Sequence, residues 1–162
     1  MSGAAASYYV DARRALLLPG PFAALGQLVA AEARRLGAAA VGGPTLGADP
    51  IACAAIAADD GVKAFFVRKE RKQHGLQRWI EGPEIADDER ALVVEDVVTT
   101  GGSLITAIER LREEGVNLAG ALVVVDRLAG GADAVSRALG DPALPYVPLF
   151  TIDDVYPERP DR

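Results

Sequence analysis

Apolar residues along this chain gather in short unbroken runs that alternate with longer stretches of helical periodicity. Leu92, Val93 and Val94 form one such run, as expected of a central parallel strand that is covered on both faces. Residues 103–114 follow, and their apolar positions recur at the spacing of a helix. Strands that alternate with helices in this way predict an α/β fold with a doubly wound, mainly parallel sheet.

The length of the chain predicts one domain, residues 1–162, and half of its residues are apolar, which is enough for a full core. Pro21 suits the first turn of a helix, and Gly37 suits a helix end. A polar loop at residues 69–77 is expected between two strands. We expect strands at residues 8–12, 38–42, 63–68, 78–81, 92–95, 119–126 and 146–150, and helices at 21–36, 48–58, 103–114 and 132–139.

Four polar segments fall where strands of the predicted sheet end. In sheets of this kind, ligands bind outside the carboxyl ends of the strands. The segments come from separate parts of the sequence, and we therefore expect them to meet around one site. They are residues 42–49, 68–75, 95–103 and 126–127.

The segment at residues 95–103 has the composition of a sugar-phosphate site, although an acidic turn before a capped helix would also account for it. A helix N-terminus binds phosphate through unpaired N–H groups and a partial positive charge, and glycines let the backbone approach closely. A carboxylate accepts two hydrogen bonds from hydroxyls, so Glu95 and Asp96 suit the 2- and 3-hydroxyls of a ribose. The expected substrate-binding residues are Glu95, Asp96, Val97, Val98, Thr99, Thr100, Gly101, Gly102 and Ser103.

The segment at residues 68–75 combines several cations with His74, the only histidine of the chain. A run of charges is usually a solvated surface, and a lone histidine is usually incidental. Here the two features coincide in a predicted loop between strands. Cations in such a loop would neutralise negative charge that develops on a departing group, so we interpret the loop as functional.

Composition narrows the classes of function. The formal net charge is -6, with 23 acidic residues against 17 basic ones, which argues against binding to nucleic acid or to an anionic membrane. The single cysteine, Cys53, excludes an intrachain disulfide, and we expect it to be buried in its alanine-rich run. No apolar stretch approaches the ~20 residues of a membrane span. A reduced, cytoplasmic protein fits these properties best.

Residues 92–103 resemble the phosphoribosyl pyrophosphate motif of the type I phosphoribosyltransferases. Other segments resemble orotate phosphoribosyltransferases in the same order along the chain, and the similarity spans almost all of it. The pattern Arg-Lys-x-x-Lys-x-His-Gly at residues 68–75 points to the orotate enzymes rather than to the fold in general. The further matching segments are residues 8–14, 41–51, 66–75, 80–83 and 125–127.

The resemblance implies an enzyme that transfers the phosphoribosyl group of phosphoribosyl pyrophosphate to orotate, in pyrimidine biosynthesis. It implies Mg2+ as the cofactor, held through the substrate and water rather than by direct protein ligands. It also implies a homodimer, in which a mobile loop at residues 69–77 closes over the pyrophosphate of the neighbouring subunit. The implied catalytic residues are Lys69, Lys72, His74 and Asp96, and Arg68 and Arg127 are implied as contacts of the pyrophosphate and of the orotate carboxylate.

Two features depart from the family pattern. Many members carry a lysine near the position of Gly47, so this loop must rely on backbone N–H groups to bind pyrophosphate. In the family a helix and a strand precede the segment that matches Tyr8 and Tyr9, whereas seven residues precede it here. We therefore expect a reduced N-terminal hood, retained binding of phosphoribosyl pyrophosphate, and weaker orotate affinity and turnover than in a longer relative.

Two alternatives stay open at this point. One is a type I phosphoribosyltransferase that acts on another base. The other is a non-catalytic protein that binds phosphoribosyl pyrophosphate as a regulatory ligand. A regulator that binds nucleic acid would want a basic face or an added DNA-binding segment, and the sequence shows neither.

Overall fold

The computed structural model describes residues 8–71 and 78–160, and its core is a six-stranded sheet in the order β3-β2-β1-β4-β5-β6. Neighbouring strands pair in parallel, except that β3 pairs with β2 in the antiparallel sense. The predicted α/β fold with a mainly parallel sheet is therefore confirmed. The strands are β1 (Ala40–Pro44), β2 (Lys63–Val67), β3 (Ile80–Glu81), β4 (Arg90–Val98), β5 (Asn117–Asp126) and β6 (Tyr146–Thr151).

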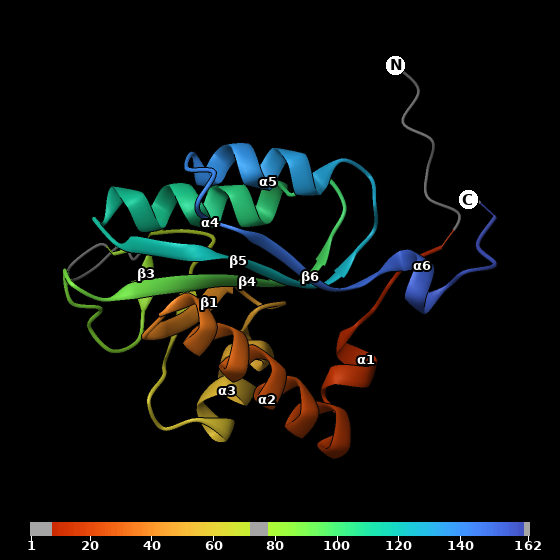
Figure 1. Ribbon diagram of the computed structural model, residues 1–162, viewed down its shortest axis with the longest axis horizontal. Coiled ribbons are helices and arrows are strands. Elements are labelled where there is room, and N and C mark those ends of the chain that lie inside the picture. Colours follow the sequence, from red (N-terminus) through yellow and green to blue (C-terminus); the bar gives the residue numbers. More distant parts are fainter. Residues whose placement is uncertain (1–7, 72–77, 161–162) are drawn as a thin grey trace.

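Helices cover both faces of the sheet, as Figure 1 shows, with α4 and α5 on one side and α1, α2 and α3 on the other. Successive residues of β4 enter different apolar clusters, because side chains alternate across a strand. Leu92 and Val94 pack with the side of α2 and α3, and Val93 packs with the side of α4. The helices are α1 (Arg13–Leu16), α2 (Pro19–Leu36), α3 (Asp49–Ala58), α4 (Gly102–Glu113), α5 (Gly131–Leu139) and α6 (Ile152–Val155).

The order of the strands reverses between β1 and β4. From β1 the chain moves outward to β2 and β3, and it then returns to place β4 on the other side of β1. The connections that leave the carboxyl ends of β1 and β4 therefore run to opposite faces, which opens a crevice between them. Within the described ranges, no helix has both the length and the apolar character that a membrane span requires.

Three local predictions were wrong. Residues 8–12 form no strand, and Tyr8 instead packs edge-to-face against Tyr156, with ring centroids 5.4 Å apart. The strand predicted at residues 92–95 continues to Val98, so Glu95 and Asp96, hereafter the acid pair, lie inside β4 rather than at its end. Cys53 is exposed, because only one stripe of the alanine-rich helix α3 faces the sheet.

Candidate functional site

A cavity of about 600 Å³ lies at the carboxyl ends of the central strands. It brings together the loop after β1, Lys69 just beyond β2, the acid pair of β4 and the start of α4. Helix α1 and the segment before it close another side. The lining residues are Tyr9, Arg13, Pro44, Thr45, Leu46, Gly47, Lys69, Glu95, Asp96, Gly102, Ser103, Thr106 and Arg110.

The two carboxyl groups of this cavity have different surroundings. Glu95 is 6% exposed, and burial, followed by the neighbouring charge of Asp96, raises its pKa to about 8, although Lys69 acts in the opposite direction. Asp96 is more open, and its Oδ1 accepts a hydrogen bond of 2.8 Å from the backbone N–H of Val97. The Nε of Arg13 lies 4.0 Å from Oδ2 of Asp96. Without a bound cation in the site, Glu95 therefore binds a proton more readily than an exposed glutamate does.

This burial predicts a pH-dependent difference in stability between the wild type and a Glu95→Gln variant. A raised pKa in the folded state means that Glu95 contributes most below about 4.5, and that this contribution is lost as the pH rises to about 8. The wild type should therefore lose stability relative to the variant across that window, by at most about 1.4 kcal/mol per pH unit.

Thermal unfolding of both proteins at several pH values across the window measures this difference. Glu109→Gln, at an exposed glutamate of α4, controls for the substitution itself. Parallel curves for the wild type and Glu95→Gln would show that burial does not hold a proton on Glu95.

Gly47 lies directly against the acid pair. A Cβ atom at this position would stand 2.5 Å from Oδ1 of Asp96 and 2.7 Å from Oε1 of Glu95, which is closer than such atoms approach one another. The loop after β1 therefore approaches the carboxyl ends of the acid pair closely at residue 47. A side chain here would require those carboxyl groups or the loop to shift.

The glycine-rich turn after β4 forms a second, adjoining cavity of about 300 Å³. Gly101 precedes α4 with φ of 84°, a conformation that favours glycine. Helix α5 packs closely against the turn, since a Cβ atom on Gly131 would lie 2.6 Å from the carbonyl oxygen of Thr99. The start of α4 thus lines a small polar hollow, and the N-terminus of a helix in such a place suits a phosphate. Its lining residues are Glu95, Val97, Val98, Thr99, Thr100, Gly101, Gly102, Ser103 and Leu104.

The basic residues that follow β2 have different positions. Lys69 lines both the cavity of the acid pair and a neighbouring one, whereas Arg68 lines the neighbouring cavity and pairs with Glu81 at 3.1 Å. Lys72 and His74 lie outside the described residues, so their predicted roles stay predictions.

Arg127 stands at the end of β5, apart from the residues that line the two cavities. Its guanidinium lies over the ring of Tyr8, 4.7 Å from the centroid, and its Nε is buried with no hydrogen-bond partner among the described residues. The preceding Asp126 fixes the turn, since its carboxylate accepts hydrogen bonds from the N–H of Leu128 and the hydroxyl of Tyr146. An unpartnered guanidinium nitrogen in this setting suits a ligand carboxylate.

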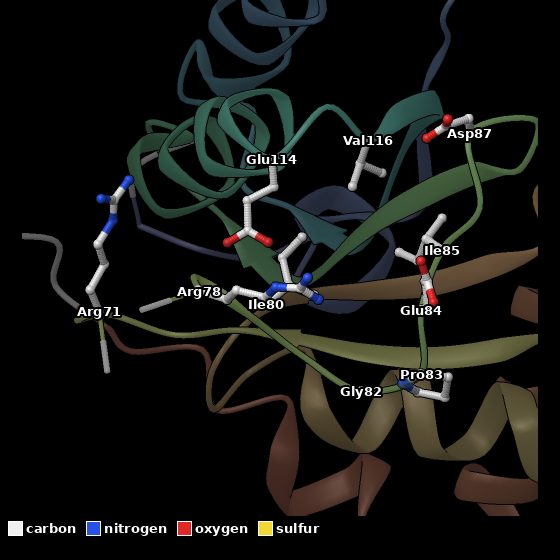
Figure 2. Close-up of a pocket in the computed structure, with 10 residues that line it drawn as sticks. All are labelled: Arg71, Arg78, Ile80, Gly82, Pro83, Glu84, Ile85, Asp87, Glu114 and Val116. Carbon is white, nitrogen blue, oxygen red and sulfur yellow. The ribbon is translucent and has the colours of Figure 1, made fainter. Parts of the chain in front are cut away.

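Another cavity, of about 520 Å³, opens beside β3 and the end of α4, as Figure 2 shows. Arg71, Arg78 and Glu114 extend toward it, and apolar side chains such as Ile80 and Val116 line its wall. It contains neither the acid pair nor the glycine-rich turn. The crevice between β1 and β4 is therefore the candidate active site.

Sequence reasoning missed several residues of the candidate site. Arg13 reaches toward the acid pair from α1, and Tyr9 lies beside it in the cavity lining. The sequence resemblance did include both residues, because they fall in the matching segment at residues 8–14. No role in the site was assigned to them there. Arg110 lies in the second half of α4 and had no local signal, because its position in the site depends on the tertiary fold.

Comparisons with known proteins identify the family of the chain. The family model described as the phosphoribosyl transferase domain matches residues 38–138. The orotate phosphoribosyltransferase of Corynebacterium glutamicum (strain R) is 48% identical over 155 residues, which covers 95% of this chain and 82% of that protein. The chain belongs to the orotate phosphoribosyltransferase family. The orotate phosphoribosyltransferase of Streptomyces avermitilis is likewise 48% identical, over 87% of this chain and 79% of its own length.

Solved structures of this family match the fold closely. The orotate phosphoribosyltransferase of Mycobacterium tuberculosis in complex with Fe(III) dicitrate has a TM-score of 0.82 and 41% identity, and the match covers 93% of this chain and 84% of the other. The same enzyme in complex with phosphoribosyl pyrophosphate has a TM-score of 0.78 and 38% identity, over 92% and 84% of the two chains. The recognised resemblance and the fold predicted from it are thus confirmed.

Proposed function

We propose that this chain is an orotate phosphoribosyltransferase, which converts orotate and phosphoribosyl pyrophosphate to orotidine 5'-phosphate and pyrophosphate in pyrimidine biosynthesis. The observation that carries the proposal is the meeting of the acid pair, the α4 N-terminus and Lys69 in one crevice. Each of these groups matches a different part of phosphoribosyl pyrophosphate, which is a ribose with a phosphate at one end and a pyrophosphate at the other.

The ribose and its phosphate fit adjoining parts of the crevice. Glu95 and Asp96 would accept hydrogen bonds from the ribose hydroxyls, and the turn before α4 would hold the 5'-phosphate through its N–H groups and hydroxyls. The loop containing Gly47 would contact pyrophosphate through backbone donors. Ribose hydroxyls stabilise the ionised carboxylate, so substrate binding favours loss of the proton that burial places on Glu95.

In the transfer step, the bond from the ribose C1 to the pyrophosphate oxygen breaks, and a bond from C1 to a ring nitrogen of orotate forms. The electron pair of the breaking bond leaves with pyrophosphate, so negative charge grows there. Lys69 would neutralise part of this charge, with Lys72 and His74 as the proposed further cations. The positive charge that develops on the ribose would be stabilised by the acid pair beneath it.

We also propose Mg2+ as the cofactor. Two carboxyl groups at one crevice, with the pKa of Glu95 raised by burial and by Asp96, form an oxygen-rich site that a cation would stabilise. Among residues 8–71 and 78–160, no group of three acidic, histidine or cysteine residues could hold an ion alone. The proposed ion would therefore be held through substrate oxygens and water rather than by direct protein ligands. Bound there, the ion would supply charge neutralisation at the pyrophosphate and the ribose hydroxyls.

The test of the function is the change in orotate absorbance when the purified chain receives phosphoribosyl pyrophosphate and Mg2+. Conversion should require all three components and should stop when a chelator removes the metal. Adenine, hypoxanthine and uracil serve as competing bases in parallel reactions. Conversion of one of these bases, with orotate left unchanged, would assign the chain to a different transferase; no conversion of any base would refute the enzymatic function.

Arg127→Ala is expected to impair orotate use more than binding of phosphoribosyl pyrophosphate. Loss of a charge-assisted contact to the orotate carboxylate should cost roughly 1.5–3 kcal/mol, seen as a higher KM for orotate. Calorimetry measures phosphoribosyl pyrophosphate binding separately, and Arg137→Ala on the exposed side of α5 is the control. Equal losses for both ligands would mean that Arg127 mainly supports the fold around Tyr8.

We propose that the enzyme is a homodimer in which Lys72 and His74 act on the neighbouring subunit, whereas Lys69 lines the cavity of its own subunit. A Lys72→Ala variant and an Asp96→Asn variant, each inactive alone, should regain activity when mixed, because one site of the hybrid dimer has both intact residues. The recovered rate should approach about a quarter of the wild-type rate if subunits pair at random. Proven subunit exchange without recovered activity would contradict the shared site.

We propose a cytoplasmic location for this enzyme. The support is its composition, since a chain with one cysteine needs no oxidising compartment to form disulfides. Fractionation of cells that express the chain at its native level tests this location.

A further inference from the structure

Arg110 connects helix α4 to the strand end that carries Lys69. Its guanidinium donates hydrogen bonds to two backbone carbonyls, those of Arg68 and Lys69, the second at 3.0 Å. The same side chain lines the cavity of the acid pair. Arg110 is eight residues beyond Gly102, so it lies about 12 Å along α4 from the end that would bind the 5'-phosphate. One rigid helix thus contacts both halves of the proposed substrate site.

The ring of Trp79 packs against the guanidinium of Arg110. The centre of the guanidinium lies 4.1 Å from the centroid of the Trp79 ring, and Arg71 approaches the same ring at 4.9 Å. The indole N–H donates a hydrogen bond of 2.9 Å to Glu113, which also pairs with Arg71 at 3.2 Å. The backbone N–H of Trp79 donates to Glu114. The residues on both sides of the segment 72–77 are therefore fastened to one end of α4.

The Arg110 contacts place a restraint on Lys69 that its own surroundings do not supply. Lys69 is exposed, and the hydrogen bond that the N–H of Arg68 donates to the carbonyl oxygen of Trp79 holds the residue before it rather than Lys69 itself. A planar guanidinium that binds two successive carbonyls fixes both the position and the direction of that backbone. Figure 2 shows Arg71, Arg78 and Glu114 at the separate cavity beside β3, whose lining does not include the acid pair.

We propose that Arg110, held by Trp79, is a positioning residue for the transfer reaction: it fixes the backbone of Arg68 and Lys69 so that the Lys69 ammonium stays at the cavity of the acid pair. The inference rests on the proposed function for its reaction, but its effect on phosphoribosyl pyrophosphate binding is separate from orotate chemistry. Arg110 acts through Lys69, and its own charge need not touch the substrate.

Arg112 offers a matched control on the same helix. Its guanidinium also donates hydrogen bonds to two successive backbone carbonyls, those of Ala138 and Leu139, but at the end of α5 and away from the crevice. Arg110→Ala and Arg112→Ala therefore remove the same kind of contact from the same helix. A stability loss should appear in both variants, whereas only the first should affect the site.

The decisive measurement is phosphoribosyl pyrophosphate binding by calorimetry, together with kcat and KM on orotate and the thermal midpoint. Arg110→Ala should weaken binding or lower kcat/KM about tenfold or more, since a misplacement of about 1 Å can cost up to about a hundredfold. Arg112→Ala should stay within about twofold of the wild type. Equal functional losses in the two variants, or a wild-type site in Arg110→Ala, would overturn the inference.

Two further variants keep the test decisive if Arg110→Ala folds poorly. Arg110→Lys retains the positive charge, but an ammonium cannot match the fork that binds both carbonyls, so an intermediate loss is expected. Trp79→Leu removes the ring and keeps the backbone contact with Glu114. It should reduce phosphoribosyl pyrophosphate affinity in the same direction, and full wild-type affinity in both variants would refute the positioning role.

The comparison of stability with affinity separates positioning from general damage. Arg110→Ala and Arg112→Ala should both lower the thermal midpoint, but only Arg110→Ala should lose affinity for phosphoribosyl pyrophosphate, and Arg110→Lys should recover part of it. If the wild type binds phosphoribosyl pyrophosphate but converts no orotate, the proposed function fails while the calorimetric comparison still tests Arg110.

Discussion

An Asp96→Asn variant is expected to lose about a hundredfold in turnover, which corresponds to about 3 kcal/mol of transition-state stabilisation. The amide has almost the shape of the carboxylate, and its oxygen can still accept the hydrogen bond from the N–H of Val97. The fold should therefore be kept. The negative charge that would stabilise the developing positive charge of the ribose is lost, and the amide presents a donor where the ribose hydroxyl needs an acceptor.

The measurement is steady-state kinetics with both substrates, combined with thermal unfolding. Asp133→Asn, an exposed aspartate in the first turn of α5, controls for the loss of one negative charge from the protein. Because the charge of Asp96 helps to raise the pKa of Glu95, the variant should also titrate Glu95 at a lower pH than the wild type. A near-wild-type rate with unchanged substrate affinity would remove Asp96 from the reaction.

The central part of the fold was predictable because its sequence signals are local. The unbroken run Leu92–Val94 matches a strand whose alternate side chains enter the two apolar clusters. The glycines at the start of α4 mark the turn that lines the small polar hollow, and the structure places them there. In both places the chemical requirement falls on neighbouring residues, so the order of residues along the chain is enough to recognise it.

The parts that could not be predicted depend on partners far away in the sequence. The segment beginning at Tyr8 reads as a strand, but its tyrosine ring packs on Tyr156 near the other end of the chain. The stack of Arg110 on Trp79 joins α4 to the residues before β3 and has no periodic pattern that could reveal it. Cys53 was misplaced because an alanine-rich helix gives little contrast between its buried and exposed faces.

Gly47 shows one feature that the sequence reveals and one that only the structure reveals. The sequence shows that the loop after β1 lacks a lysine, and this reads as a missing charged contact with pyrophosphate. The structure adds a steric requirement, since a Cβ atom would stand within 2.7 Å of both carboxyl groups of the acid pair. The glycine therefore lets the loop backbone approach Glu95 and Asp96 without displacing their carboxyl groups.

A Gly47→Ala variant is therefore expected to lose about a hundredfold in kcat/KM for phosphoribosyl pyrophosphate, because the methyl group must displace the acid pair or the loop by about 1 Å. Overpacking of this kind should also lower the free energy of unfolding by about 1–3 kcal/mol. Gly20→Ala is the control, since a Cβ atom on that helical glycine meets nothing within 4 Å. It should leave kinetics unchanged.

A double-mutant cycle identifies the atoms responsible. Asp96→Ala removes the carboxylate whose Oδ1 and Cγ would stand 2.5 Å and 2.9 Å from the new methyl carbon. The stability cost of Gly47→Ala should therefore be smaller in the Asp96→Ala background than in the wild type, with a coupling of about 0.5–3 kcal/mol. The contact with Glu95 remains, so part of the cost should persist. If the two substitutions are additive, the methyl group does not press on Asp96, and the effect of Gly47→Ala must come from the loop backbone alone.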